Sequence, residues 1–258
     1  MHWKTEEQPQ MPVNKSAVGR AFGRAAENYE QYATLQQMTG DRLLTVSDLP
    51  VSGRVLDAGC GSGRFSRYFS GRGYQGAALD ISAEMLRTAR ERDPNACYLQ
   101  ADIDALPVRA QSFDVIWSNL ALQWSADLRK ALGQLCLALN PGGSLRFSTV
   151  AAGSLPEVNQ AWQAVDNTTH VNRFLSVAEI TRAAEGYNIR LHSEQIILWF
   201  PTVRAALWSL KGVGASHLHQ RDKGLPLTRQ RLALLEAGWP KESQGYRLSY
   251  QIVYGVSE

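Results

Sequence analysis

Short apolar runs alternate with amphipathic stretches between residues 53 and 150 of this 258-residue chain. Apolar runs of this length, bounded by glycine or polar residues, predict buried strands. Between them, apolar side chains recur at helical spacing and predict helices near 63–72, 82–92 and 127–138. Strands that alternate with helices pair in parallel through right-handed crossovers, so the pattern predicts an α/β fold. Four predicted strands contain Val55–Ala58, Ala77–Asp80, Cys97–Leu99 and Phe113–Asn119, and Leu139–Phe147 is predicted to be a tight turn into a fifth strand.

The region before residue 53 is predicted to be helical. Asn14 is a suitable N-cap, because its side-chain oxygen can accept a hydrogen bond from a free backbone N–H of the first turn. Apolar residues after Asn14 recur at helical spacing. A second helix is expected from Tyr29 or Glu30 towards Leu44.

The region after residue 150 mixes helices with two strands. Two apolar runs that alternate with period two, 189–200 and 247–256, predict strands. The segment between them, 201–240, is expected to be a helical insertion. Helices are expected near 155–166, 176–185, 203–212 and 228–238.

Composition and charge exclude several classes of protein. Hydrophobic residues make up 44% of the chain and the net charge is +3, without the focused basic stripe of a nucleic-acid binder. No apolar run approaches the length of about 18 residues that a membrane span needs. Residues 1–12 are polar and are expected to form a disordered tail, not a signal peptide. We therefore expect a cytoplasmic protein that binds neither membrane nor nucleic acid.

The cysteines and histidines favour neither disulfides nor a metal site. Cys60, Cys97 and Cys136 show no C-x-x-C spacing, so free thiols in a reducing compartment are expected. The closest histidines are His217 and His219, and residues two apart do not share a helix face. No metal is therefore expected.

A glycine-rich turn follows the first predicted strand. Gly59, Gly61 and Gly63 can adopt positive φ and allow close approach of a ligand, and the next helix offers free N–H groups. The spacing is G-x-G-x-G, not the G-x-G-x-x-G of dinucleotide-binding proteins, which disfavours a nicotinamide dehydrogenase. Asp80, which ends the second predicted strand, can accept hydrogen bonds from both hydroxyls of a ribose. These features predict a nucleoside site at the carboxyl edge of the sheet.

This turn resembles the first motif of class I S-adenosylmethionine-dependent methyltransferases, E/D-x-G-x-G-x-G. The resemblance implies a Rossmann-like seven-stranded, mostly parallel sheet with one antiparallel edge strand and helices on both faces. It also implies an N-terminal helical lid, a helical insertion before the last strand, and an acid at position 102 near the adenine amino group. The residues implied to bind the cofactor S-adenosylmethionine are Asp57, Gly59, Gly61, Gly63, Asp80, Ile81, Asp102, Ile103, Asn119 and Leu120.

On this interpretation, residues 13–258 form one methyltransferase domain. Its expected parts are the lid at 13–48, the cofactor-binding core at 49–150, and an acceptor-side cap with closing strands at 151–258. In such folds the loops above the sheet select the acceptor. The acceptor must therefore be inferred from the lid and the cap.

Segments outside the cofactor motifs carry a closer resemblance. They are 14–33, 117–124, 153–157, 172–175 and 209–215. These segments are similar to malonyl-[acyl-carrier-protein] O-methyltransferases of biotin synthesis, and the similarity covers nearly the whole chain after residue 12. It implies methyl transfer to the free carboxylate of a malonyl thioester on an acidic acyl carrier protein or on coenzyme A.

The implied chemistry directs attention to a few side chains. A malonyl carboxylate is already ionised at neutral pH, so its methylation needs positioning and a counter-charge, not a general base. Arg173 in the cap is the first candidate for a bidentate clamp, while Tyr29 of the lid and Gln123 after the fourth strand could orient the acceptor. Each has a structural alternative: a surface arginine, a packed tyrosine, a loop-capping amide. Weaker substrate or partner candidates are Tyr32, Arg24, Trp124 and Lys211.

An acidic carrier protein would dock through basic side chains near the mouth of the acceptor site. The sequence does not show which basic residues share a face. The candidates are Arg20, Arg24, Arg204, Lys211, Arg221 and Lys223.

Two other functions stay open. The chain could be a class I methyltransferase of another small acid, such as trans-aconitate, or of a quinone-precursor carbon. Carbon methylation needs a base, and no residue stands out as one. A protein that binds S-adenosylmethionine without turnover is less favoured, because Asp80 and the glycines of the turn are all present.

Overall fold

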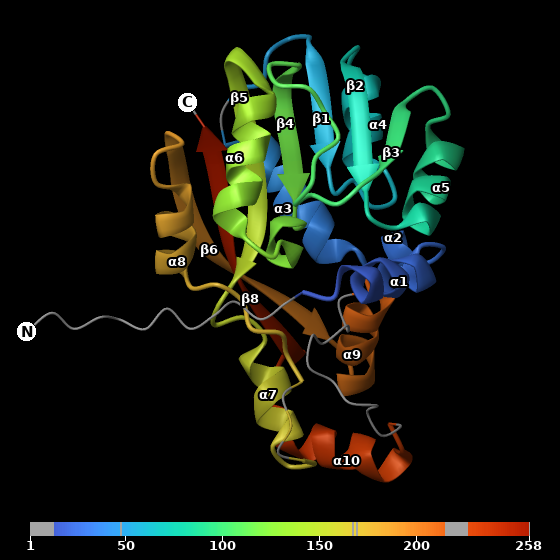
Figure 1. The fold of residues 1–258 in the computed structure, drawn as a ribbon. Coiled ribbons are helices and arrows are strands. Elements are labelled where there is room, and N and C mark those ends of the chain that lie inside the picture. Colours follow the sequence, from blue (N-terminus) through green and yellow to red (C-terminus); the bar gives the residue numbers. More distant parts are fainter. Residues whose placement is uncertain (1–12, 47, 167, 169, 215–226, 258) are drawn as a thin grey trace, which may run out of the picture.

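One mixed sheet forms the centre of the computed structural model, which describes residues 13–46, 48–166, 168, 170–214 and 227–257 (Figure 1). The strands are β1 (Arg54–Ala58), β2 (Gln75–Asp80), β3 (Cys97–Gln100), β4 (Phe113–Asn119), β5 (Leu139–Ala151), β6 (Ile189–Phe200), β7 (Lys241–Glu242) and β8 (Gly245–Ser257). Their order is β3-β2-β1-β4-β5-β8-β6, with β7 paired to β8. Strands β1 to β5 are parallel, and β8 is antiparallel to β5 and β6.

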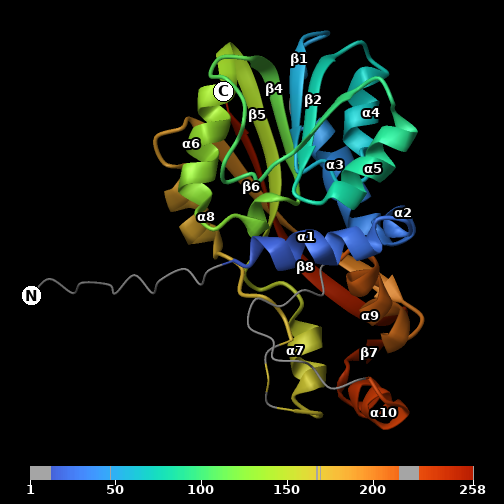
Figure 2. The ribbon, with the colours of Figure 1, turned by 45° about the vertical axis from the view of Figure 1, so that its right-hand side comes forward.

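Helices cover both faces of the sheet. They are α1 (Lys15–Ala25), α2 (Tyr29–Tyr32), α3 (Thr34–Leu44), α4 (Arg64–Ser70), α5 (Ala83–Arg92), α6 (Leu128–Ala138), α7 (Pro156–Trp162), α8 (Val177–Ala184), α9 (Val203–Gly212) and α10 (Arg229–Gly238), with a 3-10 turn at Leu122–Trp124. Successive strand residues point to opposite faces, so Val55 joins one apolar cluster with α3 and α4, and Leu56 joins another with α6 and α8. Figure 2 shows α1 lying across the lower edge of the sheet.

Strands β6 and β8 extend beyond the parallel strands. The last pair between β5 and β8 is Ala151 with Gln251, whereas β8 continues to pair with β6 as far as Tyr246. We call residues 196–200 and 245–250 the extension. Figure 1 shows α7, α9 and α10 gathered around it. The extension lies past the carboxyl end of β5, on the side where sheets of this kind bind ligands.

The predicted helices and strands are largely confirmed. After residue 53, each predicted helix is present and begins within a residue or two of its expected start. Asn14 caps α1, because its side-chain oxygen accepts a hydrogen bond from Ala17 N at 3.0 Å. The insertion at 201–240 contains α9 and α10, as expected.

Three details of the prediction are wrong. The sheet has eight strands, not seven, because Lys241–Glu242 pairs with β8 over a length too short to leave a periodic pattern. The antiparallel strand is not at the edge: β8 lies between β5 and β6, and its run at 252–254 is buried, which is typical of an interior strand. The helix expected from Tyr29 to Leu44 is interrupted at Ala33, where ψ is 28°, and becomes α2 and α3.

Some expectations fall outside the described residues. These are the tail at 1–12 and four side chains of the segment 215–226: His217, His219, Arg221 and Lys223. The predicted free cysteines are confirmed. Within the described part of the chain, no helix combines the length and apolarity needed to cross a membrane.

Candidate active site

The glycine turn lies at the carboxyl end of β1, in the middle of the sheet. Gly59, Gly61 and Gly63 have φ values of 83°, 53° and 82°, which favour glycine. A Cβ on Gly59 would lie 2.3 Å from the Cβ of Ala121, and one on Gly63 would lie 2.8 Å from a side chain of α5, so packing excludes side chains there. The nearest atoms to a Cβ on Gly61 would be those of the Tyr29 side chain, at 3.9 Å. Gly61 therefore presents an accessible backbone face.

Two carboxylates flank this turn. Asp80, at the end of β2, accepts hydrogen bonds from the backbone N–H groups of Gly61 and Ser82, both at 2.9 Å. Asp57, near the end of β1, accepts one from the hydroxyl of Ser66 at 2.6 Å. Burial raises the pKa of both carboxyls, and that of Asp57 reaches about 7. The acids fix the shape of the turn, and Asp57 exists in both protonation states near neutral pH.

The N-terminal helices cover the turn. The ring of Tyr29, at the start of α2, faces Gly61. Burial near carboxylates raises the pKa of the Tyr29 phenol, which therefore stays a neutral hydrogen-bond donor. Lys15, at the start of α1, pairs with Asp102 at 2.7 Å and with Asp104 at 2.6 Å. The lid thus contacts both the glycine turn and the loop after β3.

Asn119, at the end of β4, ties the lid to the core. Its Oδ1 accepts hydrogen bonds from the hydroxyls of Thr39 at 2.9 Å and Ser148 at 2.7 Å. Its Nδ2 donates to the backbone carbonyl of Gln36 at 2.8 Å. Because both ends of the amide are engaged, Asn119 pins α3 against β4 and β5.

The predicted cofactor residues all lie near the carboxyl ends of β1 to β4. Ile81 follows β2, Ile103 follows β3 and Leu120 follows β4. The backbone of Leu120 has a φ of 51°. The structure brings these residues to one edge of the sheet, and their contacts with a cofactor stay a prediction. Over the described ranges, no cluster of three or more His, Cys, Asp or Glu side chains could hold a metal ion.

Two neighbouring cavities lie beneath the lid. The smaller cavity, of about 40 Å³, lies over the glycine turn and is lined by residues that include Tyr29, Asp57 and Asn119. The larger cavity, of about 580 Å³, lies between α2, α3, α7, α9 and the extension. Gln36 lines both.

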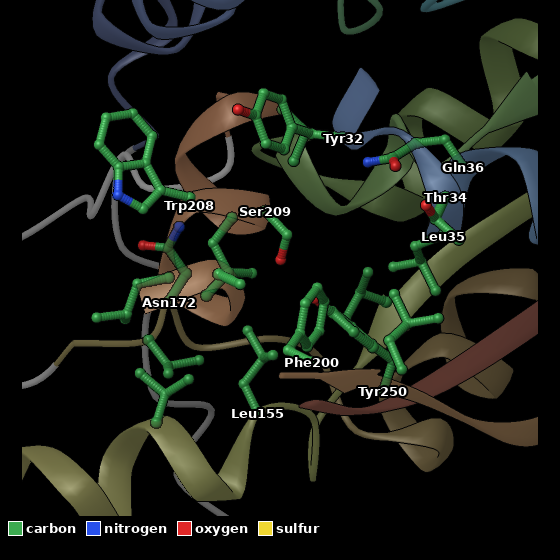
Figure 3. A pocket seen from close by; sticks show the side chains of 18 of the residues that line it. Tyr32, Thr34, Leu35, Gln36, Leu155, Asn172, Phe200, Trp208, Ser209 and Tyr250 are labelled. Carbon is green, nitrogen blue, oxygen red and sulfur yellow. The ribbon is translucent and has the colours of Figure 1, made fainter. Parts of the chain in front are cut away.

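The larger cavity is predominantly apolar. In Figure 3, Leu155 and Phe200 lie on one side of it and Tyr32 lies opposite, with Trp208 at one end. Among the described residues that line it, Arg204 is the only Lys, Arg, Asp or Glu. A cavity of this size and character suits an extended substrate with few polar groups.

Three predicted acceptor residues line the larger cavity: Gln123, Tyr32 and Trp124. The amide Nε2 of Gln123 already donates to the backbone carbonyl of Leu120 at 2.6 Å, as a loop-capping amide does. Tyr29 lines the smaller cavity and not the larger one.

The other predicted acceptor residues line neither cavity. Arg173 is 63% exposed, and its Nη2 lies 3.8 Å from a carboxylate oxygen of Glu179. Lys211 Nζ lies 4.7 Å from the ring centre of Trp208. Arg24 is exposed on α1. The structure therefore does not bring Arg173 to the cavity where the carboxylate clamp was expected.

Sequence analysis missed Gln36 as a lining residue. Gln36, Gly40 and Leu43 share one face of α3 at the i, i+4, i+7 spacing, and Gly40 and Leu43 are buried. A polar residue on such a face is the signal that could have identified it. The lining residues of the extension, Phe200 and Tyr250, lacked any signal beyond strand alternation.

The strand order, the glycine turn after β1 and the acid after β2 define a class I methyltransferase fold. The sequence profile described as a methyltransferase domain matches residues 56–147. A solved structure of phosphoethanolamine N-methyltransferase 2 from Haemonchus contortus, bound to S-adenosylhomocysteine, is similar in fold with a TM-score of 0.59 and 18% identity. The similarity covers 94% of this chain and 59% of that one.

Closer relatives define the family. The malonyl-[acyl-carrier protein] O-methyltransferase of Salmonella typhimurium is 48% identical over 246 residues, which cover 95% of this chain and 98% of the relative. The protein of the same name from Erwinia billingiae is 46% identical over 244 residues, with coverage of 95% and 97%. The chain belongs to the malonyl-[acyl-carrier protein] O-methyltransferase family, which confirms the resemblance found in the sequence.

Proposed function

We propose that this protein transfers the methyl group of S-adenosylmethionine to the free carboxylate of a malonyl thioester on acyl carrier protein. Relatives that match almost the whole chain are named for this activity. The observation that carries the proposal is that the apolar cavity and the cavity over the glycine turn lie side by side and share Gln36 as a lining residue. Methyl transfer requires such adjacent sites for donor and acceptor.

The residues over the glycine turn fit the donor. S-adenosylmethionine supplies an electrophilic methyl group on a positively charged sulfur. The open backbone of Gly61 would receive it, Asp80 would accept hydrogen bonds from the ribose, and Asp102 would face the adenine amino group. The smaller cavity, at about 40 Å³, is well below the ~300 Å³ at which the sites of small organic ligands begin. We therefore expect α2, with Tyr29, to move when the donor binds.

The apolar cavity suits the acceptor. The malonyl carboxylate is ionised at neutral pH, so no base is required. Methyl transfer neutralises its charge, and walls that exclude water favour a step in which charge disappears. Tyr29 would position the acceptor from the side of the glycine turn, and Gln123 would do so from the apolar side only after releasing the carbonyl of Leu120. Arg173 would contribute only after turning away from Glu179, and its role as a clamp stays a proposal.

The carrier protein would dock on α9 and the adjacent lid. Arg204 lines the cavity and Lys211 lies two turns further along α9. The chain after α9 packs against α1, because a Cβ on Gly214 would lie 2.9 Å from the Cα of Phe22. Basic side chains here complement an acidic carrier and would speed its association. The ester product has lost its terminal charge, so enzymes with apolar tunnels can accept it.

The purified protein tests this proposal directly. It is incubated with methyl-labelled S-adenosylmethionine and either malonyl- or acetyl-carrier protein. We expect label on the malonyl form alone, in an ester that base hydrolyses. Equal labelling of both forms would contradict carboxylate methylation. Malonyl-coenzyme A and trans-aconitate are tested as further acceptors. Their rates of methylation show how much the carrier protein and the malonyl group each contribute to the activity.

A further inference from the structure

Gln36 lies between the two cavities. Among the described residues, it is the one that lines both of them. Tyr29 and Asn119 line only the side of the glycine turn, and Gln123 lines only the apolar side. The position of Gln36 on α3 therefore allows its side chain to contact an acceptor at the point of transfer.

The amide of Gln36 is available for a ligand. Its Oε1 is buried and has no hydrogen-bond partner within the described residues. A buried polar atom without a partner costs about 1–3 kcal/mol, and such atoms call for a functional explanation. The backbone of the same residue is held firmly, because its carbonyl accepts a hydrogen bond from Asn119 Nδ2 at 2.8 Å. Gln36 thus combines a fixed backbone with an unengaged head group.

The neighbouring polar groups are already engaged. Gln123 donates to the carbonyl of Leu120, and both ends of the Asn119 amide have partners. Arg173 lies outside the cavity. Gln36 is therefore better placed than these residues to bind the reacting end of the acceptor.

We propose that the side-chain amide of Gln36 positions the acceptor carboxylate, an inference that rests on the function proposed above. The amide rotates about its last torsion and donates an N–H to one carboxylate oxygen, which leaves the other oxygen directed at the methyl group. The new bond joins that oxygen to the methyl carbon. The bond from the methyl carbon to sulfur breaks and its electron pair stays on sulfur, so no proton is exchanged.

A neutral amide suits this step better than a guanidinium. An arginine bound to the carboxylate would stabilise the charge of the ground state, which transfer diminishes, so it would improve binding of the acceptor more than the rate of the step. The amide orients the same oxygen without neutralising it. This argument explains why an apolar cavity with one charged lining residue can bind a carboxylate productively.

The test compares Gln36→Leu and Gln36→Glu with Gln160→Leu, a matched change on an exposed position of α7. We expect Gln36→Leu to lower kcat for malonyl-carrier protein by about 10- to 100-fold, and Gln36→Glu to lower it further by like-charge repulsion. The affinity for S-adenosylhomocysteine should stay within about threefold in each variant. Gln160→Leu should match the wild type.

Binding of acyl-pantetheine thioesters separates a positioning role from a structural one. With S-adenosylhomocysteine present, wild-type protein should bind malonyl-pantetheine more tightly than acetyl-pantetheine, and Gln36→Leu should lose this preference. Unchanged kcat in Gln36→Leu, or a parallel loss of S-adenosylhomocysteine affinity, would overturn the inference and leave the proposed function standing. Absence of malonyl methylation by the wild type would instead overturn both.

Discussion

Lys15 Nζ lies 2.7 Å from Asp102 Oδ1 and 2.6 Å from Asp104 Oδ2, so one lysine of the lid bridges two acids of the core. Asp102 Oδ1 also accepts a hydrogen bond from Asp104 N at 3.0 Å. The other oxygen of Asp102 is therefore the one that would face the adenine amino group in the proposed donor site. The ion pair both orients this carboxylate and holds α1 over it.

Replacing Lys15 by Met should weaken donor binding selectively. A partly buried ion pair contributes about 1 kcal/mol, so we expect the Kd for S-adenosylhomocysteine to rise about fivefold, measured by calorimetry at low salt. Discrimination against S-inosylhomocysteine, which lacks the adenine amino group, should also fall. Lys130→Met, which removes the exposed pair with Asp127 on α6, is the matched control. Unchanged affinity and unchanged discrimination in Lys15→Met would show that the pair has no part in recognition.

Gly61→Ala should impair donor binding without unfolding the protein. Gly61 and Gly73 both have positive φ, 53° and 83°, so an alanine at either position costs about 1–2 kcal/mol of backbone strain. A Cβ at Gly73 would meet nothing within 4 Å. We therefore expect equal losses of thermal stability in Gly61→Ala and Gly73→Ala, but a raised Kd for S-adenosylhomocysteine only in Gly61→Ala. Equal affinities in the two variants would remove Gly61 from the donor site.

Glu157 should be important for stability, because it anchors α7 to β8. Its buried carboxylate accepts hydrogen bonds from Arg247 Nε at 3.0 Å, Ser249 N at 3.2 Å and the Ser249 hydroxyl at 2.5 Å. Glu157→Ala leaves these donors unpaired and should cost about 3–5 kcal/mol of unfolding free energy in urea.

The control is Glu242, the second carboxylate that pairs with Arg247. Glu242 is exposed and pairs with Arg247 Nη1 at 2.8 Å, so Glu242→Ala should cost less than about 1 kcal/mol. Similar losses in the Glu157 and Glu242 variants would contradict an anchoring role for Glu157.

The glycine turn and the sheet edge on which it lies could be predicted because their signals are local. The turn from Asp57 to Gly63 carries its own backbone requirements within seven consecutive residues, and the acid at 80 ends an apolar run. Parallel strands then bring their carboxyl ends to one edge whatever the details of packing. Local sequence and a general rule of topology were sufficient here.

The acceptor side could not be predicted in the same way. Arg173 was chosen for its chemistry, but the direction of its side chain depends on Glu179, which caps α8 by accepting hydrogen bonds from Ser176. The cavity itself arises where α3, α9 and the extension meet, and these elements are far apart in sequence. The role suggested for Gln36 follows from that assembly, which no local pattern encodes.

Asp57 should make the free energy of unfolding depend on pH. Burial raises its pKa from 3.8 to about 7 in the folded protein. Between these values the folded state binds more protons at this site than the unfolded state, so its contribution to stability falls as pH rises from about 4 to 7. Between pH 5 and pH 8, the free energy of unfolding in urea should fall by at least about 1 kcal/mol more in the wild type than in Asp57→Asn.

The control is Asp114, whose contribution to the free energy of unfolding should change with pH in the opposite direction. Hydrogen bonds from Arg54 N and Asn140 lower the pKa of its carboxyl. Its contribution is present above the usual pKa and is lost as pH falls, so Asp114→Asn should weaken the protein more at pH 7 than at pH 3. A pH dependence that Asp57→Asn leaves unaltered would show that the buried carboxyl does not titrate in this range.

The kinetics of Arg173→Ala and Arg204→Ala should distinguish binding of the acceptor carboxylate from docking of the carrier protein. If Arg173 clamps the malonyl carboxylate, Arg173→Ala should lower kcat/KM by a factor that corresponds to about 2–5 kcal/mol, for carrier-bound and pantetheine-bound malonate alike. Arg204 on α9 is exposed and lines the cavity. Arg204→Ala should therefore raise KM for malonyl-carrier protein, by a larger factor at low salt than at high salt. It should leave kcat unaltered. Activity and KM within about threefold of the wild type in Arg173→Ala would remove the clamp. A KM raised by the same factor at low and at high salt, or not raised at all, in Arg204→Ala would remove Arg204 from the docking surface, because a docking cation acts through a screened charge.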